Sequence, residues 1–328
     1  MRKGYDALAR YLADSDSDPK QGYINYAASD ALGSTVITKS CCAEHITRSE
    51  PDDDINYSLL ALMLLEQHGD NLQTLDVARA WLQHLPVGQT FTAERAAYKI
   101  LLERGSEWFP EGADPKFDLT QCANNPFNDW IGAQIRADVY GWVCPGNAAK
   151  AARLVRADAE LSHQNEGVWG AVLVAALGAA LQKQTPEDAL TEALSHIPAT
   201  SDCAQAVQFG LSLTRDPQGA EQIRERYKGL SPVHTVNNLA IVIWALYANL
   251  DNFGNAIGSA VAAGLDTDCN GATVGGLWGI SGRAVPDNWT APWNGRVAVS
   301  LAGLSELSLN SLVKRTLSVT QELNAASA

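Results

Sequence analysis

The chain has 328 residues, 46% of them hydrophobic, and carries 37 acidic against 24 basic side chains, a formal net charge of −13. This length and apolar content fit a folded protein with a substantial core. An acidic chain without a Lys/Arg cluster disfavours a nucleic-acid backbone or an anionic membrane as a partner. We see no apolar run of about eighteen residues and no apolar segment after the basic N-terminus, so we expect neither a membrane span nor a secretion signal. A cytoplasmic protein is the expectation.

The six cysteines are scattered along the chain without CxxC spacing. Such scattering argues against a zinc ribbon or a disulfide scaffold, and free thiols are expected.

The apolar pattern predicts helices and few strands. Apolar periodicity and turn residues predict helices at 55–67, 75–85, 93–105, 147–162, 168–182, 186–197, 217–230, 237–250 and 270–280. Alternating strands with hairpin turns are hard to find, and no linker or regular repeat interrupts the chain. We therefore predict an all-α fold, a single compact multi-helix domain over residues 1–328.

An acidic cluster opens the first of these helices. Asp52, Asp53 and Asp54 follow Pro51 directly before the apolar segment 55–67. Capping of the helix uses one carboxylate, and three like charges together cost free energy unless solvent or a cation compensates them.

The segment 105–130 is rich in Gly, Pro, Asn and Asp and is the predicted long loop. Long irregular loops in compact domains tend to be functional. Phe127 and Trp130 offer aromatic faces for stacking on adenine, or they pin the loop to the core.

A second acidic cluster, Asp266-Thr267-Asp268, stands before the last predicted helix. An extended backbone there turns both carboxylates to one side. Carboxylates at a helix start are kept ionised by the partial charge of the helix and its free N–H groups. One alternative is simple helix capping. The other is that the two acidic helix starts converge on a pair of Mg²⁺ or Mn²⁺ ions, which prefer carboxylate oxygens.

Five segments together resemble the ADP-ribosylglycohydrolase family. DTDCNGATVGGLWG (266–279) is similar to its DTDTN-x-A signature, and PDDDINY (51–57) to its TDDT segment. GAQIRADVYG (132–141) is similar to its NGAAMR segment, AELSH (159–163) to its THxD-like segment, and SDALG (29–33) to its GDALG stretch. The segments occur in the family's order.

The resemblance implies an all-helical fold with a binuclear magnesium site, Mn²⁺ being possible, that hydrolyses the C1″ glycosidic bond of ADP-ribose on an acceptor. The metal ligands it implies are Asp52, Asp53, Asp54, Asp266, Asp268 and Cys269. The catalytic residues it implies are Asp53, Asp54 and Asp268. The substrate-binding residues are Gly132, Ala133, Arg136 and His163 by the resemblance, and Trp130 by its place in the loop.

The chain departs from the family pattern at several of these positions. Cys269 replaces a threonine ligand with a softer thiol, Asp52 stands at another threonine position, and Ile55 replaces the second threonine of TDDT. A glutamate before Asp52 that assists the chemistry in some members is matched by either Glu44 or Glu50.

Several alternatives therefore stay open. The enzyme acts on ADP-ribose or an ADP-ribosylated acceptor, or it acts on another ribosyl compound, or the chain is a non-catalytic relative like some crystallins. Retention of the four aspartates at 53, 54, 266 and 268 argues against the last. Arg136 has its own alternative as a buried ion-pair partner of Asp129 or Asp138, and His163 as a helix cap. Linkage and acceptor are open, and a monomer or a small homo-oligomer is expected.

Overall fold

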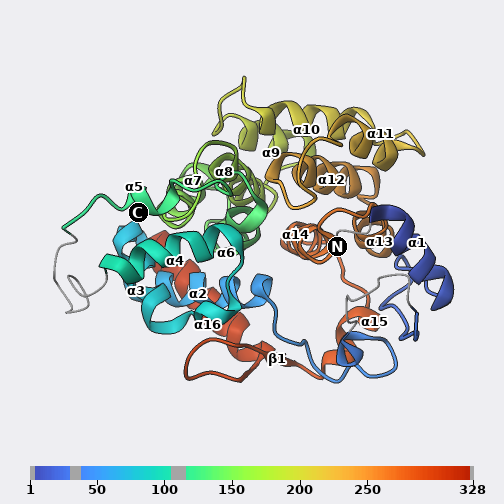
Figure 1. Ribbon diagram of the computed structural model, residues 1–328, viewed down its shortest axis with the longest axis horizontal. Helices are drawn as coiled ribbons and strands as arrows, with labels where there is room; N and C mark the ends of the chain where they lie inside the picture. Colours follow the sequence, from blue (N-terminus) through green and yellow to red (C-terminus); the bar gives the residue numbers. More distant parts are fainter. Residues whose placement is uncertain (1–3, 30–37, 105–115, 326–328) are drawn as a thin grey trace. The chain divides into compact units, whose positions relative to one another are not determined.

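A computed structural model describes residues 4–29, 38–104 and 116–325 of the chain (Figure 1). The fold is all-α, as predicted. Within the described residues the strands are two short ones, β1 (Arg296–Ala298) and β2 (Glu306–Ser308). Residues 30–33 of the SDALG segment and residues 105–115 of the predicted loop lie outside the described residues.

The chain divides into two compact units. One unit comprises Met1–Glu50 and Asp202–Ala298, and the other comprises Pro51–Ser201 and Val299–Ala328. The single domain expected from the sequence stays a prediction.

The first unit is built around α12 (Thr235–Ala248), which is buried along nearly its whole length. It contacts α10, α11, α13 and α14 because nearly every face of this helix is apolar. The helices of this unit besides α12 are α1 (Gly4–Asp14), η1 (Lys39–Cys41), α10 (Asp202–Ser212), α11 (Gly219–Arg226), α13 (Phe253–Ala262), α14 (Thr267–Ile280), α15 (Asp287–Thr290) and η6 (Ala291–Trp293).

The second unit is built around α8 (Asn165–Ala180), which is likewise apolar on nearly all faces. It contacts α6, α7, α9 and η5. The helices of this unit besides α8 are α2 (Asp53–His68), η2 (Gly69–Asn71), α3 (Thr74–His84), η3 (Val87–Gln89), α4 (Thr92–Arg104), α5 (Thr120–Ala123), η5 (Ile131–Arg136), α6 (Asp138–Trp142), α7 (Ala148–Ala159), α9 (Pro186–Leu194) and α16 (Leu309–Ala325).

The glycines of α14 allow this helix to lie against α13. A Cβ at Gly275 would lie 3.3 Å from Cδ1 of Ile257, and one at Gly271 would lie 3.5 Å from Cγ2 of Val261. Larger side chains on this face would push the two helices apart. The contact offsets the low helix propensity that glycine brings.

Two further expectations are met. All six cysteines lie in the described residues and form no disulfide with one another. Among the described helices, none is both long and apolar enough to cross a membrane.

Candidate active site

The late acidic motif lies at the start of α14. Gly264, at φ +91°, turns the chain out of α13, and Asp266 is the N-cap residue of α14. The helix begins at Thr267, three residues earlier than predicted, so Asp268 is already helical. The prediction of an extended backbone across this motif is therefore wrong. Thr267 and Asp268 belong to the first turn of α14, where the backbone N–H groups have no partner inside the helix.

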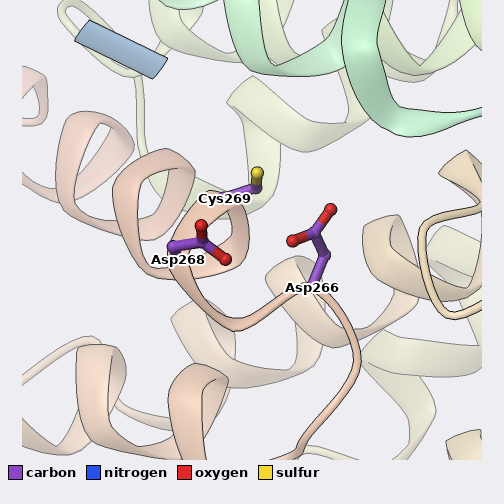
Figure 2. Close-up of side chains that lie close together, drawn as sticks. All are labelled: Asp266, Asp268 and Cys269. Carbon is purple, nitrogen blue, oxygen red and sulfur yellow. The ribbon is translucent and has the colours of Figure 1, made fainter. Parts of the chain in front are cut away.

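The three candidate ligands of this motif nevertheless lie together. One oxygen each of Asp266 and Asp268 and the Sγ atom of Cys269 are all within 4.8 Å of one another. Figure 2 shows the three side chains at the start of the helix. Asp266 and Cys269 are each 4% exposed, whereas Asp268 is exposed. One carboxylate is thus anchored in the protein and another is accessible to solvent.

Asp266 does not use its carboxylate to cap the helix. Its side chain accepts no hydrogen bond from the first backbone N–H groups of α14. Aspartate at an N-cap position commonly makes this bond. The capping interpretation, which the sequence left open, therefore does not apply to Asp266.

The early acidic motif lies at the start of α2 and behaves differently. Asp52 is the N-cap residue, and its Oδ1 accepts the N–H of Ile55 at 2.8 Å. Asp53 and Asp54 lie in the first turn, where Asp53 is half-buried and Asp54 is 6% exposed. One aspartate of the three caps the helix, as the sequence suggested, and two follow it in the first turn.

The central segment forms η5, and Arg136 at its end is only 2% exposed. Its Nε donates to Asp158 Oδ1 at 2.5 Å, and Nη1 donates to Glu94 Oε1 at 3.0 Å and to the carbonyl of Gly132 at 2.8 Å. Nη2 donates to the carbonyl of Asp158 at 3.3 Å and to Ser162 Oγ at 2.9 Å. All five N–H groups of the guanidinium are thus used inside this unit.

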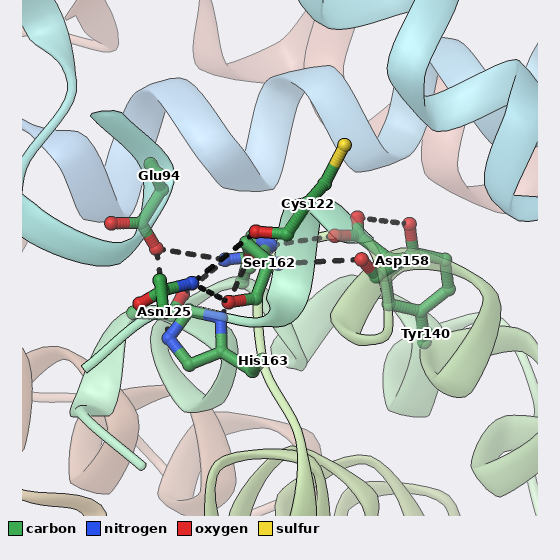
Figure 3. A network of polar contacts seen from close by, with 9 residues as sticks. Glu94, Cys122, Asn125, Tyr140, Asp158, Ser162 and His163 are labelled. Carbon is green, nitrogen blue, oxygen red and sulfur yellow. Dashed lines mark hydrogen bonds and ion pairs between the residues drawn. The ribbon is translucent and has the colours of Figure 1, made fainter. Parts of the chain in front are cut away.

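This arrangement confirms the buried ion-pair alternative for Arg136 but with different partners. The carboxylates are Glu94 from α4 and Asp158 from α7, and not Asp129 or Asp138 (Figure 3). Burial alone would lower the pKa of Arg136, but Asp158 and Glu94 raise it. Burial raises the pKa of Glu94 in spite of the guanidinium. Tyr140 adds a hydrogen bond to Asp158 Oδ2 at 2.7 Å.

His163 belongs to the same network and is fully buried. Its Nδ1 lies 2.8 Å from Ser162 Oγ, and its Nε2 lies 3.9 Å from Glu94 Oε1. Burial, followed by the charge of Arg136, lowers the pKa of His163 well below its usual value. Because the ring is neutral at neutral pH, its contact with Glu94 is not an ion pair.

Ser162, His163 and Glu94 have the residue types of a catalytic triad, namely a nucleophile, a base and an orienting acid. Their positions do not suit such a triad, because all three side chains are buried. Ser162 and His163 are 0% exposed and Glu94 is 3% exposed. A nucleophile has to reach its substrate, and Ser162 Oγ already accepts from Arg136. The network therefore packs the centre of this unit.

The comparisons with known proteins bear on the whole chain. The family model described as ADP-ribosylglycohydrolase matches residues 21–321. The chain belongs to the ADP-ribosylglycohydrolase family. A solved structure described as an ADP-ribosylglycohydrolase-related protein complex shares this fold, with a TM-score of 0.58 and 18% identity over 98% of this chain and 100% of that chain. No curated protein matches the chain.

Membership of the ADP-ribosylglycohydrolase family makes this chain a hydrolase of that type. Among the segments that resemble the family, the NGAAMR-like one shows a strict steric requirement. A Cβ at Gly132 would lie 2.0 Å from Glu94 Oε1, so a larger residue there would displace the carboxylate that holds Arg136. Ala133 is fully buried, whereas Trp130 is half-buried and meets Phe127 edge-on at 4.8 Å between ring centroids. This contact joins two residues of the predicted loop to each other.

The two glutamates before the early ADP-ribosylglycohydrolase motif differ in their surroundings. Glu50 pairs with Arg48 through both oxygens, at 3.0 and 3.1 Å. Glu44 Oε2 accepts the N–H of Tyr26 at 3.1 Å, and hydrogen bonds from the backbone lower its pKa. Glu44 is thus an ionised carboxylate without the bidentate arginine that engages Glu50.

Sequence reasoning missed Glu94, Asp158 and Asn238. A buried arginine requires carboxylate partners, but these lie 42 and 22 residues from Arg136. Asn238 contacts the late motif from 28 residues away. No periodicity connects such residues, so only the folded chain identifies them.

Proposed function

We propose that this ADP-ribosylglycohydrolase is a magnesium-dependent enzyme that cleaves the C1″ glycosidic bond between ADP-ribose and an acceptor. The observation that carries the proposal is the clustering of Asp266, Asp268 and Cys269 within 4.8 Å at the start of α14. Family membership supplies the link from this cluster to ADP-ribosylated substrates.

The donor set of the late motif fits a hard divalent cation. Two carboxylates offer the oxygen atoms that Mg²⁺ and Mn²⁺ prefer, while the Cys269 thiol is a softer donor than the family's threonine. The side chain of Asp266 makes no helix-capping bond, and Asp268 is exposed to solvent in the first turn of the same helix. Magnesium would be held by the carboxylates, with Cys269 a weaker contributor.

In the second unit, Asp53 and Asp54 are the proposed ligands of the metal. Both lie in the first turn of α2, where free backbone N–H groups and the helix partial charge favour carboxylates in the ionised form. Asp52, which the resemblance also implies as a ligand, has one oxygen engaged by the N–H of Ile55. We therefore assign Asp52 first to the helix and only its second oxygen to a metal.

The bound cations would supply Lewis acidity and a water of lowered pKa. The residues of this chain then have three tasks. An ionised aspartate, for which Asp53, Asp54 and Asp268 are the candidates, accepts the proton of the attacking water. The neighbouring carboxylates stabilise the positive charge that develops at C1″ in an oxocarbenium-like transition state.

The third task is to position the substrate. The exposed carboxylate of Asp268 is accessible to a ribose, and the partly accessible ring of Trp130 suits stacking on adenine. Gly132 and Ala133 stay the proposed close-approach segment. Arg136 supports that segment from within the protein, because it donates to the carbonyl of Gly132.

The test is hydrolysis of ADP-ribosylated arginine, an ADP-ribosylated serine peptide and O-acetyl-ADP-ribose, each with and without Mg²⁺. We expect metal-dependent release of ADP-ribose from at least one of them, which also identifies the linkage. Asp268→Ala is expected to abolish it. Metal binding without turnover would favour another ribosyl compound as substrate, and no metal binding at all would favour the non-catalytic alternative.

A further inference from the structure

The side chain of Asn238 lies in the first turn of α12 and is fully buried. Its Nδ2 donates to the carbonyls of Pro232 and His234, each at 2.8 Å. Its Oδ1 accepts from the backbone N–H of Asp266 at 3.1 Å and from Nδ2 of Asn270 at 2.8 Å. Carbonyls only accept and N–H groups only donate, so these four contacts fix which end of the amide faces the late motif.

These contacts replace the usual anchor of a helix start. An aspartate at the N-cap normally holds the first turn with its own carboxylate, as Asp52 does in α2. Asp266 makes no such bond in α14. Oδ1 of Asn238 instead holds the backbone at Asp266 and the first turn of the helix at Asn270.

The arrangement leaves the carboxylates of Asp266 and Asp268 next to each other and to Cys269. Two like charges at this separation repel each other until a cation is bound. A backbone held in place by Asn238 cannot relax away from that repulsion. The ligands are then ordered before the cation arrives, and less conformational freedom is lost on binding.

We propose that Asn238 is a positioning residue that orders Asp266 and Asp268 for a divalent cation. The inference rests on the metal dependence in the proposed function. It goes beyond that function because it assigns to an uncharged side chain of α12 a share of the affinity for the metal.

The competing explanation is that Asn238 only fastens α12 to α14. Asn249 provides a matched control, since it is an asparagine at the other end of α12 whose Nδ2 donates to the carbonyl of Ala245 in the same helix. Its replacement removes a side-chain hydrogen bond from α12 without touching the late motif.

The experiment is titration calorimetry of Mn²⁺ into the wild-type protein, Asn238→Ala, Asn270→Ala and Asn249→Ala. Replacing an outer residue that orients metal ligands typically costs about 10- to 100-fold in affinity. We expect a loss of about 10-fold or more for Asn238→Ala, a smaller loss for Asn270→Ala, and a change of less than about 2-fold for Asn249→Ala. Saturating Mn²⁺ is expected to restore the activity of Asn238→Ala.

Wild-type affinity in Asn238→Ala, or an equal loss in Asn249→Ala, would overturn the inference. If Asn238→Ala does not fold, Asn270→Ala decides, and unchanged Mn²⁺ affinity there would contradict it. The failure of the proposed function looks different. A wild-type protein that binds Mn²⁺ but hydrolyses no ADP-ribosyl substrate contradicts that function alone, and one that binds no Mn²⁺ contradicts both.

Discussion

At the scale of single residues, the centre of the second unit holds polar groups in a low-dielectric environment. Asp138 in α6 is 7% exposed, and its Oδ1 has no hydrogen-bond partner among the described residues. Burial raises the pKa of Asp138 to about 8. The folded protein therefore keeps this carboxyl protonated at neutral pH, while the unfolded chain ionises it at about pH 4.

This difference predicts a stability that falls as the pH rises. Between about pH 4 and pH 8 the folded state binds more protons than the unfolded state, so the free energy of unfolding decreases with pH. For Asp138→Asn we expect this contribution, about 3 kcal/mol between about pH 5 and pH 7.5, to be removed. Urea unfolding of both proteins at the two pH values measures it. Parallel pH profiles of the two proteins would show that Asp138 is ionised in the folded state.

At the scale of elements, Arg136 joins three helices. It lies in η5, Glu94 lies in α4 and Asp158 lies in α7. The rings of Tyr57 and Trp81 lie 5.6 and 5.2 Å from its guanidinium carbon and add cation–π contacts. The guanidinium of Arg136 therefore links η5, α4 and α7. Its charge is neutralised by the two carboxylates, and all its N–H groups are hydrogen-bonded.

Removing that charge is expected to cost much more than removing an exposed one. Arg136→Met leaves two buried carboxylates without a counter-charge, which typically costs about 3–5 kcal/mol. Arg153 in α7 pairs with Asp70, and the two side chains are 51% and 40% exposed. Arg153→Met should cost less than about 1 kcal/mol. Chemical denaturation compares the two variants, and a similar loss in both would disprove a special role for the buried network.

The elements also show what the sequence could predict. Apolar periodicity found α2, α3, α4, α7, α8, α9, α11, α12 and α14 to within a few residues. It missed α1 and α10. It also missed α13, whose glycines and small residues weaken the helix signal, and α16, which buries only Val319 and Leu323. Both helices form against neighbours, α13 on α12 and α14, and α16 on α2. Their stability comes from packing that a local pattern does not contain.

In the candidate site, too, the local pattern is visible in the sequence and the long-range contacts are not. Local chemistry makes Asp53, Asp54, Asp266 and Asp268 the candidates, because acidic pairs before apolar helices are visible in the sequence. The groups that hold the motifs in place come from other elements, such as Asn238 for Asp266. Their pairing depends on long-range folding, which no spacing rule gives.

At the scale of the whole molecule, the net charge of −13 means that binding of the proposed cation would affect stability as well as catalysis. Like charges destabilise the compact state through mutual repulsion. A divalent cation at the start of α14 would neutralise the charges of Asp266 and Asp268, which lie close together. The folded protein would bind such an ion far better than the unfolded chain, in which the carboxylates are dispersed.

A ligand that binds only the folded state raises its stability by mass action. The gain is about 2.7 kcal/mol when the free ligand exceeds its dissociation constant about 100-fold. We therefore expect Mg²⁺ or Mn²⁺ to raise the melting temperature of the wild-type protein by several degrees over NaCl of equal ionic strength, and EDTA to reverse the rise.

The shift in melting temperature, and not the melting temperature itself, is the quantity to compare between variants, since Asp268→Ala also removes a favourable charge from the start of α14. The shift should be small or absent in Asp268→Ala and retained in Asp251→Ala, which removes an exposed aspartate of the same unit. Equal shifts in both variants would mean that the cations act by general screening of the acidic surface and not at the start of α14.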